Sequence, residues 1–252
     1  MNGDYNMIKK RFFLLLGIMT LLLAGCGSNG SNTDISNETS EIKDESKEID
    51  IVGDWYGVAE VHSEYNDGLF EAVLSINSDG RWASCVNGDV NQGTWEIVTE
   101  SKKRIALTVE YEGSGVTNTW SFEKKADGKF YYDYVFLETI PIEMTKMEKE
   151  SKDQMLGDWQ GATVYTYKSG EEKQFAASLS INADNSWSSS VSGDNNAGKW
   201  SYISESGHLV VLIVEYDGTD ATNTWALVKN ADDEYYYEYV YMENISIPVV
   251  KL

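Results

Sequence analysis

The chain has 252 residues, of which 42% are hydrophobic and 12% aromatic, and this apolar content excludes a largely disordered protein. Its formal net charge is −21. From Cys26 onward, 17 basic and 40 acidic side chains give −23. Such a charge repels phosphate backbones and anionic lipid headgroups, so we expect no nucleic-acid partner and no membrane anchoring by overall charge.

Residues 1–25 have the pattern of a signal peptide. Lys-Lys-Arg at 9–11 precedes an apolar run over 12–24, which is shorter than the roughly 20 residues needed to span a bilayer. Leu23-Ala24-Gly25-Cys26 then resembles the bacterial lipobox, whose cysteine is lipidated and becomes the mature N-terminus. The resemblance implies lipidation of Cys26 and a lipid-anchored protein on the extracytoplasmic face of the cell membrane. The alternatives are an ordinary signal peptide with an incidental cysteine, or an uncleaved helix.

Residues 26–50 are rich in Ser, Asn, Glu, Asp and Lys, and they contain no aromatic residue and no apolar periodicity. Such a segment cannot offset the conformational entropy lost on ordering. We therefore predict a disordered tether between Cys26 and the folded part.

Two copies of one sequence follow the tether. Gly53-Asp54-Trp55-Tyr56-Gly57 matches Gly157-Asp158-Trp159-Gln160-Gly161, and residues 70–147 align without a gap on 175–252, with 37 of 78 positions identical. All eight tryptophans fall in matched pairs. We predict two domains, 51–148 and 155–252, joined by a short charged linker.

Each copy shows the two-residue hydrophobic period of β-strands. In the first copy, about eight short strands are predicted to begin near residues 54, 69, 81, 93, 103, 117, 129 and 142. Turns such as Ser78-Asp79-Gly80 separate them. The fold class is therefore all-β, with two tandem copies of a small antiparallel meander barrel, because closure removes exposed sheet edges. A β-sandwich is the alternative.

The motifs carry a family resemblance. Gly-Asp-Trp on the first strand of each copy, the Asp-Gly hairpin and Gly93-Thr94-Trp95 in mid-domain resemble lipocalin-like domains of bacterial lipoproteins, within the calycin group. The resemblance implies an eight-stranded barrel. Each copy is shorter than a full lipocalin and lacks its terminal helix and its base-closing arginine, so a filled interior is favoured over a hollow calyx.

Metal and cofactor chemistry are not indicated. His62 and His208 occupy unmatched places in the repeats, and neither has metal-ligand spacing to Cys or acidic residues. If Cys26 is lipidated, Cys85 has no disulfide partner, and Cys85 is matched by Ser190 in the second copy, so it is no shared nucleophile. We expect no cofactor, no metal and no enzymatic activity.

The strongest local candidate for a ligand site is a strand pair shared by both copies. Asn118 and Trp120 follow a Glu-Tyr-Glu-Gly turn, and Asn223 and Trp225 follow Glu-Tyr-Asp-Gly. These side chains offer a hydrogen bond and a stacking face to a sugar or another polar ring. The alternative is a turn with a buried tryptophan behind it.

A tyrosine-rich strand is the second candidate. Alternation over 130–136 and 235–241 places four aromatic residues on one face, so Tyr131 with Asp133, and Tyr236 with Glu238, share the other. An aromatic ring beside a carboxylate is suited to a glycan. A plain solvated strand face is the alternative.

These observations favour a non-enzymatic surface lipoprotein that binds a small molecule, glycan or protein. Duplication would raise its avidity if both copies can engage together. An inhibitor of an extracellular enzyme and a structural spacer of the cell envelope are the competing hypotheses.

Overall fold

The computed structural model describes residues 49–252, apart from 65–66, 137, 168, 216–221 and 241–242. The predicted signal peptide, Cys26 and nearly all of the predicted tether lie outside the described residues. In the part that is described, no helix has the length and apolarity needed to cross a bilayer.

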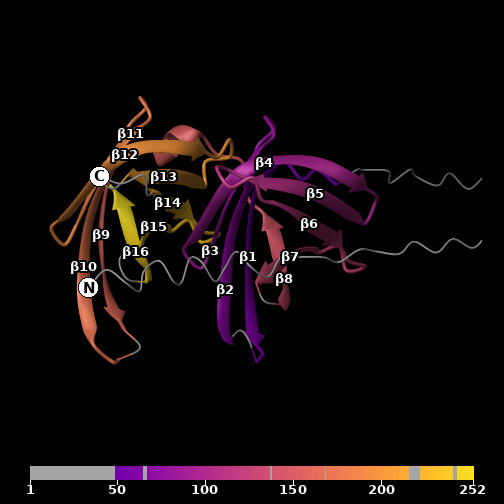
Figure 1. The fold of residues 1–252 in the computed structure, drawn as a ribbon, viewed down its shortest axis with the longest axis horizontal. Helices are drawn as coiled ribbons and strands as arrows, with labels where there is room; N and C mark the ends of the chain where they lie inside the picture. The colour runs from indigo at the N-terminus through magenta and orange to yellow at the C-terminus, as the bar shows by residue number, and fades with distance from the viewer. Residues whose placement is uncertain (1–48, 65–66, 137, 168, 216–221, 241–242) are drawn as a thin grey trace, which may run out of the picture. The chain divides into compact units, whose positions relative to one another are not determined.

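The first copy folds into a closed eight-stranded antiparallel barrel, barrel 1, in which every strand pairs with its neighbours in the chain and β8 pairs back with β1 (Figure 1). Its strands are β1 (Gly53–His62), β2 (Asp67–Ile76), β3 (Arg81–Val86), β4 (Asp89–Glu100), β5 (Arg104–Tyr111), β6 (Thr117–Lys124), β7 (Phe130–Phe136) and β8 (Glu138–Lys146). The predicted barrel is confirmed, and the sandwich alternative is not adopted.

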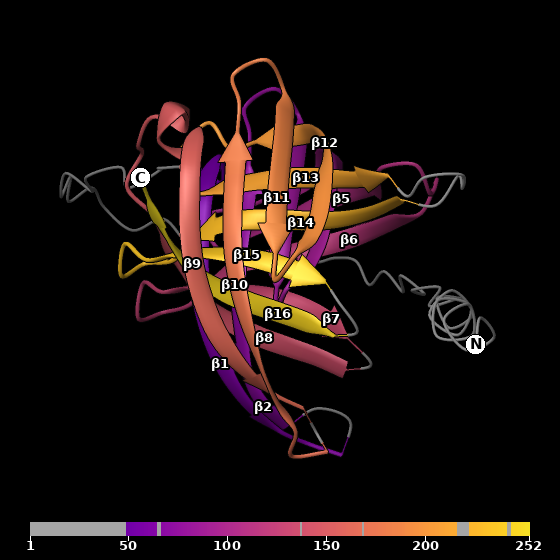
Figure 2. The same ribbon diagram turned by 90° about the vertical axis from the view of Figure 1, so that its left-hand side faces the viewer.

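The second copy repeats the topology as barrel 2. After a short 3-10 turn η1 (Lys152–Met155), its strands are β9 (Gly157–Thr166), β10 (Glu172–Ile181), β11 (Ser186–Val191), β12 (Asp194–Ile203), β13 (Leu209–Glu215), β14 (Thr222–Lys229), β15 (Tyr235–Val240) and β16 (Asn244–Lys251). In Figure 2, β9–β11 run upright and β13–β15 run across them, so the wall of barrel 2 turns sharply between its two halves. A bulge in β12 between Trp200 and Tyr202 lies where the wall turns.

The Gly-x-Trp-x-Gly motif closes each barrel. Gly57 pairs with Met144 on β8, and a Cβ at Gly57 would lie 2.3 Å from the Glu143 carbonyl oxygen. At Gly161 the corresponding distance, to the Pro248 carbonyl oxygen, is 1.9 Å. A side chain does not fit at either position, so glycine allows the first and last strands to approach closely enough to pair.

The barrel interiors are filled with side chains. The core of barrel 1 contains Trp55, Trp82 and Phe122, all at most 2% exposed. Trp82 and Trp120 meet edge to face, with ring centroids 4.3 Å apart. Trp159 and Trp187 lie in the equivalent core of barrel 2. Burial of these rings is the main stabilising contribution within each barrel.

The two barrels also share an apolar contact. We call this contact the barrel interface. It joins the outer face of β2–β4 to the outer face of β12–β14, and its buried members are Val73, Ala83, Cys85, Val90, Tyr202, Leu209, Val211, Ala226 and Val228.

Comparison of the repeats shows that this interface joins two different faces. Val73, Ala83, Cys85 and Val90 of barrel 1 correspond to Ser178, Ser188, Ser190 and Asn195 of barrel 2. On the other side, Leu209, Val211, Ala226 and Val228 correspond to Arg104, Ala106, Ser121 and Glu123. Each face is apolar in the copy that uses it and more polar in the copy that does not. A head-to-tail contact that could otherwise extend to further copies is therefore restricted to two barrels.

A buried polar network holds one edge of the interface. Asp54 of β1 is 0% exposed, and its Oδ2 accepts hydrogen bonds from the Ser204 hydroxyl and from the His208 backbone N–H at 3.2 Å. The His208 ring Nδ1 lies 2.9 Å from the same oxygen. Beside it, Asn77 donates to the Ile203 carbonyl at 3.2 Å. The equivalent Asp158 is exposed, and among the described contacts its carboxylate accepts a hydrogen bond only from the Ser180 hydroxyl, at 2.6 Å.

The reactivity of the Cys85 thiol reports whether the barrel interface is closed. Its thiol is buried, and desolvation together with the nearby Glu238 raises its pKa well above the ordinary value. In a chain that begins at Gly27, Cys85 is the only thiol, and we expect it not to react with a disulfide reagent while the barrels are in contact. Reaction should appear on unfolding. Complete reaction of the native protein within minutes would contradict the closed interface.

Candidate functional site

In each barrel, the turns after the first, third, fifth and seventh strands gather at one end. This follows from the up-and-down order of the strands. We call the inward-facing residues at this end the mouth. In barrel 1 the mouth contains Ser84, Asp89, Asn91, Tyr111, Asn118 and Tyr134.

Strand register shows that these side chains face inward. Directly opposed residues in an antiparallel pair point to the same face. Asp89 is paired with the core residue Val86, and Asn118 with the core residue Val109. Asn91 is paired with Ser84, one position away from both Val90 and Gln92, which contact barrel 2.

An aromatic layer lies directly below the polar residues of the mouth. Tyr111 contacts Trp82 edge to face, with ring centroids 5.2 Å apart, and Trp120 contacts Tyr132 in the same way at 5.4 Å. At the rim, the ring of the half-buried Tyr134 lies beside that of Phe70, with ring centroids 6.3 Å apart. The mouth therefore combines aromatic surface with hydrogen-bonding groups.

Electrostatics set the protonation of the mouth. Burial raises the pKa of Tyr111, and the nearby polar groups of Asn118 and Trp120 oppose this shift only in part. Burial and the Asp89 carboxylate likewise raise the pKa of Tyr134. Both phenols therefore stay neutral at physiological pH and can donate hydrogen bonds to a ligand.

Barrel 2 has the same mouth in a more closed form. Its described members are Ser189, Asp194, Asn196, Asn223 and Tyr239. The Tyr239 hydroxyl donates to Asp194 at 2.8 Å, and Tyr239 is 1% exposed where Tyr134 is half-buried. The Asn196 side-chain nitrogen is buried and has no hydrogen-bond partner among the described residues. Tyr216, which corresponds to Tyr111, lies outside them.

The five mouth residues described in both copies are identical, whereas Ala59 and Val61, which face the same interior from β1, correspond to Thr163 and Tyr165. Ser84, Asp89, Asn91, Asn118 and Tyr134 match Ser189, Asp194, Asn196, Asn223 and Tyr239 in order. Polar residues facing a barrel interior contribute little to packing, because burying them carries a desolvation cost. Their retention contrasts with the barrel-interface positions on the outer faces of the same strands, such as Val90 and its counterpart Asn195, which differ between the copies.

The asparagine and tryptophan predicted as site residues in each copy lie at different depths in the barrel. Asn118 and Asn223 are half-buried at the mouths, whereas Trp120 and Trp225 are 4% and 2% exposed in the layer below. The indoles are thus packed against aromatic neighbours and offer no exposed stacking face. The Trp225 indole nitrogen is buried without a hydrogen-bond partner in the described part of the chain. A role in ligand binding stays a prediction for all four.

The second pair lies on the outside of the barrels, away from the mouths. Tyr131 is half-buried on the outer face of β7, where its hydroxyl donates to Glu143 at 3.3 Å and Lys125 lies 3.6 Å from its ring centre. Asp133 is half-buried on the same face. In barrel 2, Tyr236 packs against the barrel interface and Glu238 is buried, so the outer wall of barrel 1 covers this copy.

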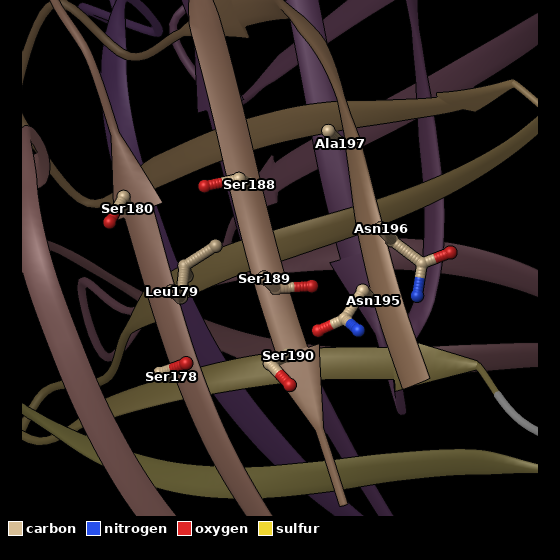
Figure 3. A pocket seen from close by; sticks show the side chains of 9 residues that line it. All are labelled: Ser178, Leu179, Ser180, Ser188, Ser189, Ser190, Asn195, Asn196 and Ala197. Carbon is tan, nitrogen blue, oxygen red and sulfur yellow. The ribbon is translucent and has the colours of Figure 1, made fainter. Parts of the chain in front are cut away.

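A shallow depression marks the outer face of β10–β12, as Figure 3 shows. Among the residues lining it, Ser178, Ser188, Ser190 and Asn195 correspond to the interface residues of barrel 1. Its lining has no aromatic ring, and it also includes Leu179 and the mouth residues Ser189 and Asn196. The outward-facing part of the depression is best explained as the unused counterpart of the barrel interface.

Sequence reasoning missed Asp89 and Asn91 and their counterparts. The signal was present: two polar residues two positions apart, identical in both copies, on a strand whose intervening residues had changed. Without the register, these residues read as part of a turn.

Comparison with protein-family models and with curated proteins finds no match. Among solved structures, the chain is similar to a protein of unknown function from the DUF3598 family of Nostoc punctiforme. The two are 12% identical over 79% of this chain and 93% of that one, with a TM-score of 0.26. At this level of similarity the match supports no functional argument.

Proposed function

We propose that this chain is a lipid-anchored, non-enzymatic binding protein of the extracytoplasmic face, and that the mouth of each barrel binds a small hydroxyl-rich ligand such as a saccharide. The observation that carries the proposal is the identical inward-facing polar set over an aromatic layer in both copies. Binding sites of this kind combine mostly apolar walls with a few placed polar groups.

The hydrogen-bonding groups of the mouth suit ligand hydroxyls. Asp89 accepts, the amides of Asn91 and Asn118 both donate and accept, and the neutral Tyr134 donates. A sugar hydroxyl does both, so it can satisfy any of them. Phe70 and Tyr134 at the rim offer flat apolar surface to the carbon face of a ring.

The two mouths differ in accessibility, and the difference indicates which of them binds ligand first. Phe70 and Tyr134 of barrel 1 are half-buried, whereas Phe175 and Tyr239 of barrel 2 are each 1% exposed. Barrel 1 is therefore the more open of the two sites, and we expect it to fill first.

The test replaces Asn118 by leucine in the chain from Gly27 to Leu252 and titrates a panel of mono- and disaccharides by NMR. Both barrels and both cores lie within residues 49–252, so this chain keeps the described fold. Loss of the amide should weaken binding to barrel 1 about tenfold or more, because an unpaired buried group costs about 1–3 kcal/mol. Asn195→Leu, on the outer face of barrel 2, is the matched control and should bind as the parent does. If no saccharide shifts mouth resonances, the ligand class is wrong.

The anchor is tested separately in producing cells. The parent chain should incorporate labelled fatty acid and sediment with membranes, and Cys26→Ser should do neither. A Cys26→Ser protein that stays in the membrane fraction would rule out the lipidated cysteine as the anchor.

A further inference from the structure

Two neighbouring hairpins of barrel 1 carry a concentration of basic residues that the equivalent hairpins of barrel 2 lack. They are the β4–β5 turn, residues 100–104, and the β6–β7 turn, residues 123–129. The Lys124 backbone N–H donates to the Lys103 carbonyl at 2.7 Å, so the two turns lie side by side. A shallow depression runs between them. We call this pair the basic hairpins.

Their charge is opposite to that of their counterparts. Six basic residues, Lys102, Lys103, Arg104, Lys124, Lys125 and Lys129, stand against Glu100, Glu123 and Asp127, which gives +3. In barrel 2, residues 205–209 and 228–234 contain one lysine and four acidic residues, which gives −3. The reversal is confined to one copy, so the barrel fold does not require it.

The basic side chains are exposed and only partly neutralised. All six side chains are exposed to solvent. Lys129 forms an ion pair with Glu143 at 2.6 Å, and Arg104 donates to the Ser121 hydroxyl at 2.7 Å. Lys102 and Lys103 have no ion pair among the described residues. Their positive charge is therefore available to an outside partner.

The position of the basic hairpins in the fold favours a membrane surface as their partner. The turns after β2, β4 and β6 gather at the end opposite the mouth, and the chain enters β1 at that same end, next to Gly53. The predicted tether lies outside the described residues, and a flexible chain of about 24 residues would have an average reach of about 25–30 Å. An anchor at Cys26 would therefore hold this end of barrel 1 nearer the bilayer than its mouth. The acidic β12–β13 turn of barrel 2, which contacts Asp54 through Ser204 and His208, would be held near the bilayer as well.

We propose that the basic hairpins dock onto anionic lipid headgroups and orient the tethered protein, with the mouth of barrel 1 directed away from the membrane. The inference rests on the proposed lipid anchor. Overall charge opposes membrane binding, so the tether supplies the attachment and the hairpins supply the orientation. Each lysine near an anionic surface strengthens docking about fivefold.

The test uses an artificial tether, so that it does not depend on lipidation of Cys26. The chain from Gly27 to Leu252, preceded by a histidine tag, is bound to phosphatidylcholine vesicles that contain a nickel-chelating lipid, with or without phosphatidylglycerol. A fluorescent donor is attached at Ala126→Cys, on the β6–β7 turn, or at Ala231→Cys, the equivalent exposed position of barrel 2. Energy transfer to a headgroup-labelled lipid then reports which tip approaches the membrane, and the buried Cys85 stays unlabelled.

With phosphatidylglycerol, we expect stronger transfer from position 126 than from 231, and loss of the difference at about 0.5 M NaCl. Lys103→Gln should lower the ratio of docked to undocked protein about fivefold, and Lys199→Gln, on barrel 2, should leave it unchanged. Equal energy transfer from positions 126 and 231 would overturn the proposal. Energy transfer that is the same with and without phosphatidylglycerol would overturn it as well. Failure of fatty-acid labelling at Cys26 would instead remove the anchor and leave the docking result standing.

Discussion

Replacing Asp54 by alanine is expected to lower the free energy of unfolding by about 3–5 kcal/mol, because it breaks a buried polar network on one side only. The carboxylate accepts hydrogen bonds from the Ser204 hydroxyl and the His208 backbone, and it contacts the His208 ring. All of these groups are buried. Without Asp54 they remain desolvated and unpaired.

The repeat provides the matched control. Asp158 occupies the same position in barrel 2, but it is exposed. Asp158→Ala should therefore change the free energy of unfolding by less than about 1 kcal/mol. Urea unfolding followed by tryptophan fluorescence measures both variants, and Cys85 should become reactive in Asp54→Ala at lower urea than in the parent. Equal effects of the two substitutions would show that Asp54 does not fasten the barrels together.

Stability should fall as pH rises because of Glu238. Burial at the interface raises the pKa of this carboxyl from 4.5 to about 7, and the hydrogen bond from Ser246 and the charge of Glu71 modify the shift in opposite directions. Between pH 4.5 and about 7 the folded state holds a proton that the unfolded chain has released. The free energy of unfolding therefore decreases through this window by up to about 3 kcal/mol and is constant above it.

Glu238→Gln removes the titrating group and should abolish this contribution. At pH 8 the variant should be more stable than the parent by up to about 3 kcal/mol, and at pH 4 the two should agree. Asp133→Asn changes the corresponding half-buried residue of barrel 1, which has no barrel against it, and should have a small effect. Urea unfolding across pH 4–8 measures all three proteins. A parent profile that rises with pH over this window would contradict the assigned burial of Glu238.

The strands and the closed barrels could be predicted from the sequence because inward positions repeat every two residues. β3, β5, β6 and β7 begin within one residue of the predicted starts, at 81, 104, 117 and 130. β4 and β8 begin at 89 and 138, four residues before the predicted 93 and 142. Each of these strands begins with a polar residue, Asp89 or Glu138, and has one buried apolar residue, Val90 or Ile140, before the predicted start. One apolar residue among polar neighbours is too short a pattern for hydrophobic periodicity to detect.

The barrel interface and much of the mouth could not be predicted in this way. Val73, Cys85 and Val90 look like ordinary strand residues until the register places them outside barrel 1. Asp89 has the composition of a turn, and only its pairing with Val86 places it inside. In both cases the missing information was which face of a strand meets which partner, and this depends on contacts between segments far apart in the chain.

Native mass spectrometry of the chain, purified gently from producing cells and never exposed to denaturant, tests the proposed function most directly. We predict one or two small molecules bound per chain, with barrel 1 occupied first, and loss of the first of them in Asn118→Leu but not in Asn195→Leu. A bare chain mass in the parent protein, or a bound mass that Asn118→Leu leaves untouched, would contradict the assignment of the barrel mouths as ligand sites.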